Sequence, residues 1–120
     1  MLTEIREVKQ EAGGRRRWFE DDGLELIVWY GPASAVEGFQ ICYTTDAGRQ
    51  ERALTWRAAD GFAHARVEPG DDSPLKNQTP ILVPDGTVPW AELEAEFGER
   101  SRGLEAELRQ LVLARLQARR

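Results

Sequence analysis

The chain has 120 residues, with 16 lysine and arginine residues against 21 aspartate and glutamate residues, so its formal net charge is −5. This length fits one domain, which we assign to residues 1–120, and a hydrophobic content of 41% argues against a disordered chain. The acidic balance disfavours nucleic-acid binding, and no apolar run is long enough to span a membrane. One cysteine and one histidine exclude a disulfide framework and a Cys and His zinc site, so we expect no metal and no cofactor.

Residues 1–68 predict an antiparallel β-meander of about five to six strands. Glycine-containing turns separate runs that are rich in Ile, Val, Trp, Phe and Tyr, which is the pattern of consecutive hairpins. The predicted strands cover residues 3–11, 15–21, 24–30, 38–45, 51–58 and 62–68. The third of these is apolar on both faces from Leu26 onward, which predicts that it is the most enclosed strand.

Two tight turns predict how the last three of these strands pair. We take Ala47-Gly48 and Asp60-Gly61 as two-residue turns, because glycine tolerates the positive φ that such turns require. The first turn predicts the pairs Phe39–Trp56, Ile41–Leu54, Gln40–Thr55 and Cys42–Ala53; the second predicts Trp56–Ala65, Leu54–Val67, Arg57–His64 and Thr55–Arg66. The two registers place the large apolar side chains on one face of the sheet and the polar side chains on the other.

The remainder of the chain predicts a long loop, a short strand and two helices. Residues 69–80 are turn formers and polar residues, and residues 81–83 are a possible strand. Pro89 suits the first position of a helix that Gly98 would end, and Ser101 would cap a second helix. The apolar stripe of that second helix is Leu104, Leu108, Leu111, Val112 and Leu116. The predicted fold class is therefore α+β, with a helical hairpin packed on one face of the sheet.

Three residues of the predicted polar face form the candidate ligand site. In the registers above, Arg57, His64 and Arg66 lie together, and two guanidinium groups beside an imidazole would bind a carboxylate or a phosphate. Lys76 in the 69–80 loop is a further candidate ligand-binding residue. The alternative interpretation is that these residues are only the solvated face of a half-buried sheet. Cys42 lies too far along the strand from His64 to act as a nucleophile with a histidine base, so we expect no catalytic residue.

Charge separates sharply within the predicted helices. Residues 85–99 carry five carboxylates and no cation, whereas residues 100–120 carry six arginines and two glutamates. The apolar stripe from Leu104 to Leu116 would pack on the sheet or, alternatively, seat a partner helix. Self-association through this helix, as a homodimer in which the acidic and basic segments pair, is therefore one expectation.

Several strings resemble a group of short bacterial proteins that carry no assigned function. These strings are GRRRWFEDD, GFQICYTT, ERALTWRAADGFAHARVEPG and TPILVPDG, and together they span most of the chain. The resemblance implies a bacterial protein of the cytoplasm, and it transfers no catalytic residue, cofactor or partner.

The sequence favours a small cytoplasmic module that binds a ligand or a protein partner without catalysis. The absence of a recognisable nucleophile, metal-ligand pattern or phosphate-binding loop supports this reading. The alternative is a small anionic-ligand binding protein or enzyme that uses the face carrying Arg57, His64 and Arg66. A membrane role is not expected, and nucleic acid is a disfavoured partner.

Overall fold

The computed structural model describes residues 1–5, 15–45, 50–68, 81–84 and 88–118. Seven strands in these residues form one antiparallel sheet whose spatial order follows the chain order. The strands are β1 (Thr3–Ile5), β2 (Arg15–Glu20), β3 (Leu24–Tyr30), β4 (Val36–Thr45), β5 (Gln50–Arg57), β6 (Gly61–Glu68) and β7 (Ile81–Pro84). The predicted α+β meander is confirmed, and the possible strand near residue 81 joins the sheet as its last member.

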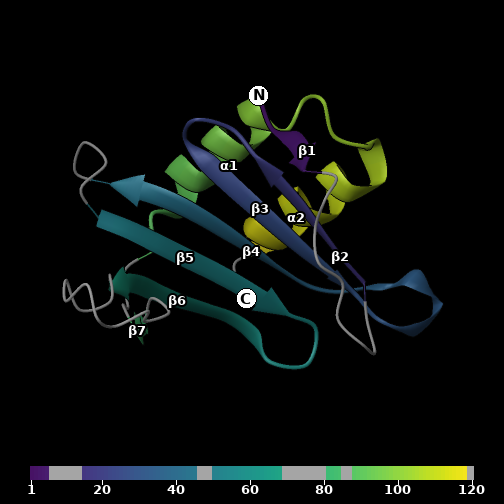
Figure 1. The fold of residues 1–120 in the computed structure, drawn as a ribbon, viewed down its shortest axis with the longest axis horizontal. Helices are drawn as coiled ribbons and strands as arrows, with labels where there is room; N and C mark the ends of the chain where they lie inside the picture. Colours follow the sequence, from purple (N-terminus) through teal and green to yellow (C-terminus); the bar gives the residue numbers. More distant parts are fainter. Residues whose placement is uncertain (6–14, 46–49, 69–80, 85–87, 119–120) are drawn as a thin grey trace, which may run out of the picture.

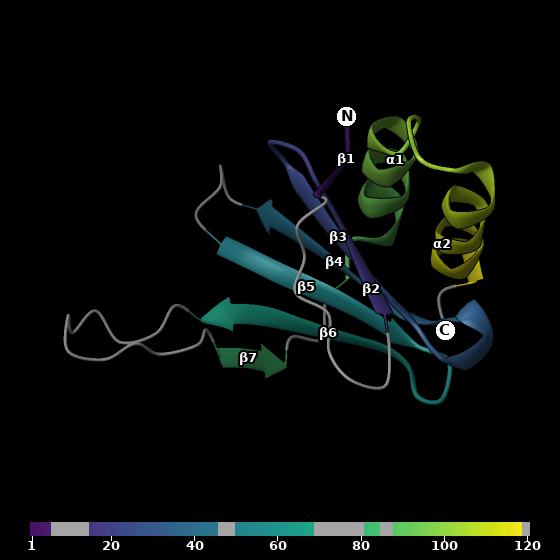
Figure 2. The ribbon, with the colours of Figure 1, turned by 45° about the vertical axis from the view of Figure 1, so that its right-hand side comes forward.

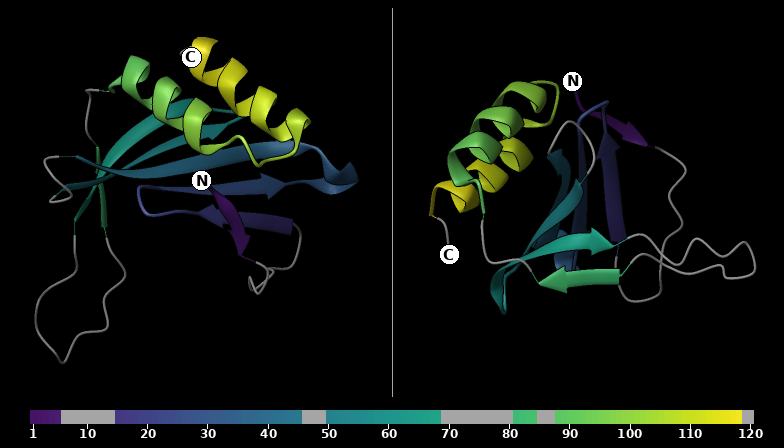
Figure 3. Two further views of the ribbon diagram at one scale, coloured as in Figure 1. Left: turned by 90° about the horizontal axis from the view of Figure 1, so that it is seen from above. Right: turned by 90° about the vertical axis from the view of Figure 1, so that its left-hand side faces the viewer.

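Both helices lie on the same side of the sheet (Figures 1 and 3). They are α1 (Trp90–Arg100) and α2 (Ala106–Ala118), and they pack against each other as a hairpin. Figure 2 shows the helices over the β1 to β4 part of the sheet, with β6 and β7 extending beyond them. We call the face that the helices cover the inner face and the opposite one the outer face.

The hydrophobic core fills the space between the inner face and the two helices. Alternate residues of the central strands point into it, and Val28, Phe39 and Leu54 are fully buried there. From the helices, Phe97 and Leu116 are equally buried. The stripe of α2 therefore packs on the sheet, as an amphipathic helix beside an apolar face should.

The predicted pairing of β4 with β5 is confirmed, but the predicted pairing of β5 with β6 is wrong. Phe39 lies opposite Trp56, as expected, whereas His64 lies opposite Leu54 and not opposite Arg57. The hairpin closes through a three-residue loop at 58–60, in which the Asp60 amide donates to the Arg57 carbonyl, and Gly61 takes a φ of 79°. This changes the register by three residues. Because the change is odd, every side chain of β6 moves to the other face.

The ends of the two helices also differ from the prediction. Gly98 does not end α1, which continues to Arg100, and Ser101 closes that helix with its amide donating to the Phe97 carbonyl. Ser101 does not cap α2, which begins at Ala106. Its side chain is buried and accepts a hydrogen bond from Arg109 Nε at 3.0 Å. This buried contact joins the residue that ends α1 to Arg109 of α2 and uses the hydroxyl that was predicted to cap the second helix.

The predicted polar loop at 69–80, with the candidate residue Lys76, lies outside the described residues. Within the described part of the chain, no helix is both long enough and apolar enough to cross a membrane.

Candidate functional site

The register of β4, β5 and β6 builds a polar row at one end of the inner face. Tyr43 pairs with Arg52, and Arg52 pairs with Arg66. The adjacent row along the strands is Ile41, Leu54 and His64, and the row after it is Phe39, Trp56 and Phe62. The inner face therefore changes from an aromatic core to a cluster of ionisable side chains within three rows. We call Tyr43, Arg52, His64 and Arg66 the inner polar cluster.

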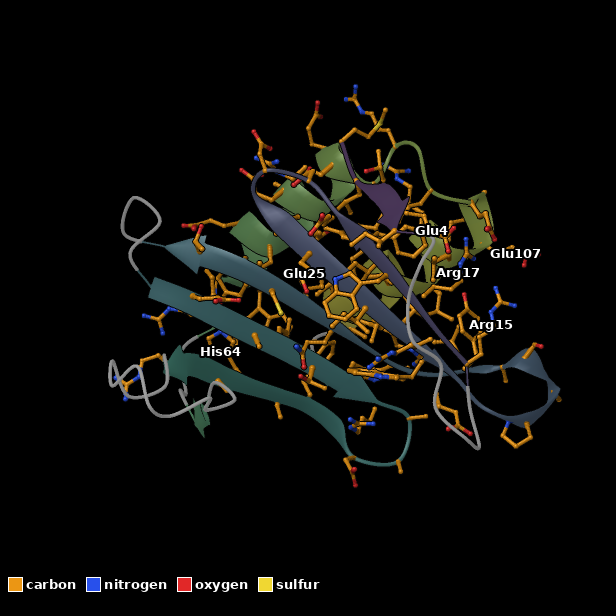
Figure 4. The ribbon with its side chains drawn as sticks, in the orientation of Figure 1. Glu4, Arg15, Arg17, Glu25, His64 and Glu107 are labelled. Atoms are coloured by element: carbon orange, nitrogen blue, oxygen red, sulfur yellow. The ribbon has the colours of Figure 1, made fainter. Side chains whose placement is uncertain are left out.

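Tyr43 and His64 form the centre of the inner polar cluster. The Tyr43 hydroxyl and the His64 Nε2 share a short hydrogen bond, and the two rings stack with their centroids 5.9 Å apart. Figure 4 shows His64 on β6, near the end of the sheet where β7 lies. A hydrogen bond and a ring contact between residues 21 positions apart in the chain fix both side chains.

Both members of this pair are held in their neutral forms. Burial lowers the pKa of His64 below its ordinary value, and the Arg52 guanidinium lowers it further. Burial also raises the pKa of Tyr43 to about 12; Glu92 acts in the same direction and Arg52 opposes it. At neutral pH both groups are therefore uncharged, and the tautomer of the imidazole sets which of them donates in this hydrogen bond.

Arg52 and Arg66 place two positive charges beside this pair. They lie directly opposite each other on neighbouring strands, and both side chains are half-buried. Opposed residues in an antiparallel pair have Cβ atoms about 5 Å apart, so the two long side chains start from neighbouring positions. Both arginines also make contacts within the chain. A guanidinium group has several N–H donors, which suit an oxyanion.

A groove adjoins the cluster on the side of α1. It has a volume of about 430 Å³, and Tyr43 and Thr44 form its strand wall. The helix wall carries Glu92 and Glu96, and Arg100 closes one end. Arg100 is already bound to carboxylates, with contacts of 2.8 Å to Glu96 and 3.0 Å to Asp21. Of the inner polar cluster, Tyr43 lines the groove, and the charged lining residues are Glu92, Glu96 and Arg100.

The structure brings together two of the four predicted ligand residues. His64 and Arg66 both lie in the inner polar cluster, two positions apart on the same face of β6. Arg57 lies on the outer face, where its guanidinium sits 4.7 Å from the Trp29 ring centroid. The predicted trio is therefore divided between the two faces of the sheet. Lys76 is outside the described residues.

Sequence reasoning missed Arg52 and Tyr43, which take the place of Arg57. Both residues follow from the confirmed register of β4 and β5, so the error lies only in the hairpin after β5. A three-residue loop at 58–60, followed by Gly61 with a positive φ, fits the same sequence equally well. A prediction based on that loop would have placed His64 opposite Leu54 and Arg66 opposite Arg52.

Cys42 belongs to the outer face and takes no part in the cluster. It pairs with Ala53, and Gln40 Nε2 donates to its sulfur at 3.2 Å. Burial raises the pKa of the Cys42 thiol to about 11, so the thiol keeps its proton at neutral pH. Among the described residues, no group of histidine, cysteine, aspartate and glutamate side chains is placed to hold a metal ion.

Searches of protein-family models, of curated proteins and of solved structures found no match to this chain. The function must therefore be argued from the geometry of the chain itself.

Proposed function

We propose that this protein is a binding module for a small anionic ligand, which it holds at the inner polar cluster without catalysing a reaction. The observation that carries the proposal is the direct pairing of Arg52 with Arg66 beside the Tyr43 and His64 pair. The proposal places the protein in the cytoplasm, where its one cysteine stays a thiol.

Electrostatics favours an anion between the two arginines. Both arginines also make contacts within the chain. An oxyanion that reaches both guanidinium groups would add an attraction to each of them. A guanidinium fork matches the geometry of a carboxylate or a phosphate, and each charge-assisted hydrogen bond contributes about 1.5 to 3 kcal/mol.

The groove beside α1 limits the rest of the ligand. Glu92 and Glu96 line its helix wall, so a second negative group extending along the groove would be repelled. Leu93 and Leu24 line the same groove and offer apolar contact. The fitting ligand class is therefore a compact molecule with one carboxylate or phosphate end and an uncharged or cationic body.

The same geometry argues against an acyl-transfer or thiol enzyme. Cys42 lies on the opposite face of the sheet from His64 and holds its proton at neutral pH. A general base must lie within hydrogen-bond reach of the nucleophile that it activates. Binding without covalent chemistry is thus the function that these side chains support.

The decisive experiment uses the fact that the chain has one histidine. We expect inorganic phosphate, titrated at constant ionic strength, to shift the single imidazole proton signal in NMR along a saturable curve. Bound anion stabilises imidazolium, so the pKa of His64 should rise on binding and affinity should increase as the pH falls.

Two variants on opposite faces make this test specific. Arg66→Gln removes a cation of the inner polar cluster and should weaken phosphate binding by about tenfold or more. Arg57→Gln removes an arginine of the outer face and should leave binding within about twofold of the parent. The absence of a saturable shift, or an equal loss in both variants, would overturn the proposal.

Self-association through the helix from Leu104 to Leu116 is a second proposal with less support. Leu108, Val112 and Leu116 are at most 5% exposed within one chain, so the stripe is occupied by the sheet. Met1 is the one large hydrophobic side chain that is exposed among the described residues. A homodimer would therefore need polar surfaces of the two helices, and light scattering across a concentration series measures whether it forms.

A further inference from the structure

A second cavity lies at the opposite strand ends, between the start of β2, the end of β3 and α2. Its volume is about 440 Å³, within the range of small-molecule sites. Residues of three kinds line it: the charged Glu4, Arg15, Arg17, Glu105 and Glu107, the hydroxyl-bearing Tyr30 and Ser34, and the apolar Val36, Leu108 and Leu111. Figure 4 shows Arg15 and Glu107 together at this side of the molecule, far from His64.

Arg17 holds one wall of the cavity together through contacts with two carboxylates. Its Nε and Nη2 bind both carboxylate oxygens of Glu4 at 2.9 and 2.8 Å, and Nη2 also lies 2.7 Å from Glu105. Its side chain is 13% exposed, and its guanidinium lies 5.0 Å from the Phe19 ring centroid. Arg17 therefore joins β1, β2 and the segment before α2, and its charge is used within the protein.

Arg15 and Glu107 supply opposite charges from opposite walls. Arg15 is exposed, and its guanidinium lies 5.4 Å from the Tyr30 ring centroid. Glu107 is exposed in the first turn of α2. Among the described residues, no ion pair links these two side chains, whereas Arg17 forms ion pairs with Glu4 and Glu105 in the same cavity lining. A ligand that bridges Arg15 and Glu107 must itself carry both charges.

The floor between these charges is apolar. Leu108 is 5% exposed, and Leu111 and Val36 are partly buried against the core. Tyr30 adds an aromatic surface on the strand side. An aliphatic or aromatic group placed here would be removed from water between α2 and the sheet, and its burial would favour binding.

The rim of the cavity is held in an unfavourable backbone conformation. Ala33 and Ser34, in the 3₁₀ turn η1 (Pro32–Ser34), have φ angles of 66° and 60°, and neither is glycine. Hydrogen bonds from the Ser34 amide to the Gly31 carbonyl and from the Gly31 amide to the Ala35 carbonyl hold the turn. Such strain persists only where the surrounding structure enforces it, and it concentrates at binding sites.

We propose that this cavity binds a free amino acid with an apolar side chain. The carboxylate would pair with Arg15, the ammonium group with Glu107, and the side chain would lie on Leu108 and Leu111. The carboxylate of the ligand would thus meet a cation, its ammonium group an anion, and its side chain the apolar floor of the cavity. The site lies at the other end of the strands from the inner polar cluster and does not depend on it.

Calorimetric titration of the full chain with L-leucine and two analogues tests the proposal. Leucine amide lacks the carboxylate, and 4-methylpentanoate lacks the ammonium group. We expect leucine to bind and each analogue to bind at least about tenfold more weakly. Equal binding of 4-methylpentanoate and leucine would show a simple anion site and overturn the proposal.

Charge-removing variants identify the site. Arg15→Gln and Glu107→Gln should each weaken leucine binding by about tenfold or more. Arg16→Gln, whose side chain is on the other face of β2, is the matched control and should bind like the parent. Unfolding midpoints of all variants establish that each is folded. Failure of the parent to bind leucine, phenylalanine or valine at millimolar concentrations, or equal loss in Arg16→Gln, would contradict it.

Discussion

Arginine side chains have different surroundings in the β1 to β3 part of the sheet and in the β5 to β6 part. Near β1 to β3, Arg17 binds Glu4 and Glu105, and Arg100 binds Asp21, Asp22 and Glu96. Each of these arginines joins elements that are distant in the chain. In β5 and β6, Arg52 and Arg66 face each other across the strand pairing. In the first region arginines thus join separate elements through ion pairs, whereas in the second two arginines occupy opposed positions on neighbouring strands, where each also has contacts within the chain.

The largest expected effect comes from Asp21, the carboxylate that anchors Arg100. Its Oδ1 accepts the amides of Gly23 and Leu24 at 2.8 Å each, and its side chain is 5% exposed. Asp21→Ala should lower the free energy of unfolding by about 2 to 4 kcal/mol, since it leaves these donors and the Arg100 contact unsatisfied. Urea denaturation measures the change.

Its neighbour provides the control. Asp22 also contacts Arg100 at 3.0 Å, but its side chain is 95% exposed. Asp22→Ala should therefore cost less than about 0.5 kcal/mol. Equal effects at the two positions would show that charge alone, and not the buried hydrogen bonding of Asp21, stabilises this corner of the molecule.

Asp21 also predicts how acid weakens this region. Burial alone would raise the pKa of Asp21, but the Gly23 and Leu24 amides and the Arg100 guanidinium outweigh it and hold the pKa at about 2. Since the ordinary aspartate pKa is about 3.9, the stabilisation is complete above that pH and is lost as the pH falls toward 2. The stability difference between the parent and Asp21→Asn should narrow over this interval in urea titrations.

Arg17 is expected to give the next largest effect. Arg17→Met keeps much of the side-chain volume but leaves Glu4 and Glu105 near each other without a cation, so stability should fall by about 1 to 2 kcal/mol. Arg102→Met is the matched control, because Arg102 makes one 2.8 Å contact with Glu99 and is 65% exposed. Its loss should cost less than about 0.5 kcal/mol. An equal loss of unfolding free energy in Arg102→Met and Arg17→Met would contradict the role of Arg17 as a buried link between elements.

A smaller effect is expected from His64 in mild acid. The folded state holds the pKa of His64 below its ordinary value of about 6.5, so the unfolded chain binds a proton first as the pH falls. Stability should be insensitive to this group above pH 7 and should decrease as the pH falls below about 6.5. The stability of His64→Gln should decrease less as the pH falls, and identical slopes for the two proteins would contradict the assignment.

The smallest effect is on the titration of His64 itself. Arg52 is one cause of the lowered pKa of His64, so Arg52→Gln should move that pKa upward. Arg57→Gln, on the outer face, should leave it unchanged. The single histidine signal in NMR measures the pKa of His64 in both variants. An equal rise of that pKa in Arg57→Gln would contradict the assignment of Arg52 as the cation that lowers it.

The sequence predicts this fold well because alternation and turn residues are local signals. Strand β3 has the predicted bounds, and the register of β4 with β5 is as expected. The error in β6 has a local cause too. Asp60-Gly61 fits both a two-residue turn and the end of a three-residue loop, and composition does not distinguish them.

The candidate site depended on that single ambiguity. His64 and Arg66 were predicted as ligand residues, yet their neighbours were wrong because the face of β6 was wrong. The predictions of the helix ends were wrong for a different reason. The Ser101 side chain binds Arg109, eight residues further along the chain, and the capping pattern of Ser101 does not reveal this contact. Short-range signals therefore defined the elements, while tertiary contacts decided which side chains meet.

The separation of charge between the two helices is partly resolved within one chain. Arg102 pairs with Glu99, and Gln117 donates to Glu94 at 3.1 Å. One of these contacts is an ion pair between the acidic and the basic segment, and it forms within one chain. Pairing of the other charges between two copies stays a prediction. Salt should weaken these exposed contacts without separating the helices, whose buried leucines hold them to the sheet.

Cys42 gives the chain a chemical reporter of its own opening. Its pKa of about 11 leaves roughly one thiolate per thousand molecules at pH 8 while the sheet is intact. An unfolded cysteine, with a pKa near 8.5, would be about a quarter ionised at that pH. Alkylation at pH 8 should therefore be roughly 250-fold slower in the intact sheet than in a molecule in which β4 has separated from its neighbours, and a destabilising variant that opens the sheet should react faster than the parent.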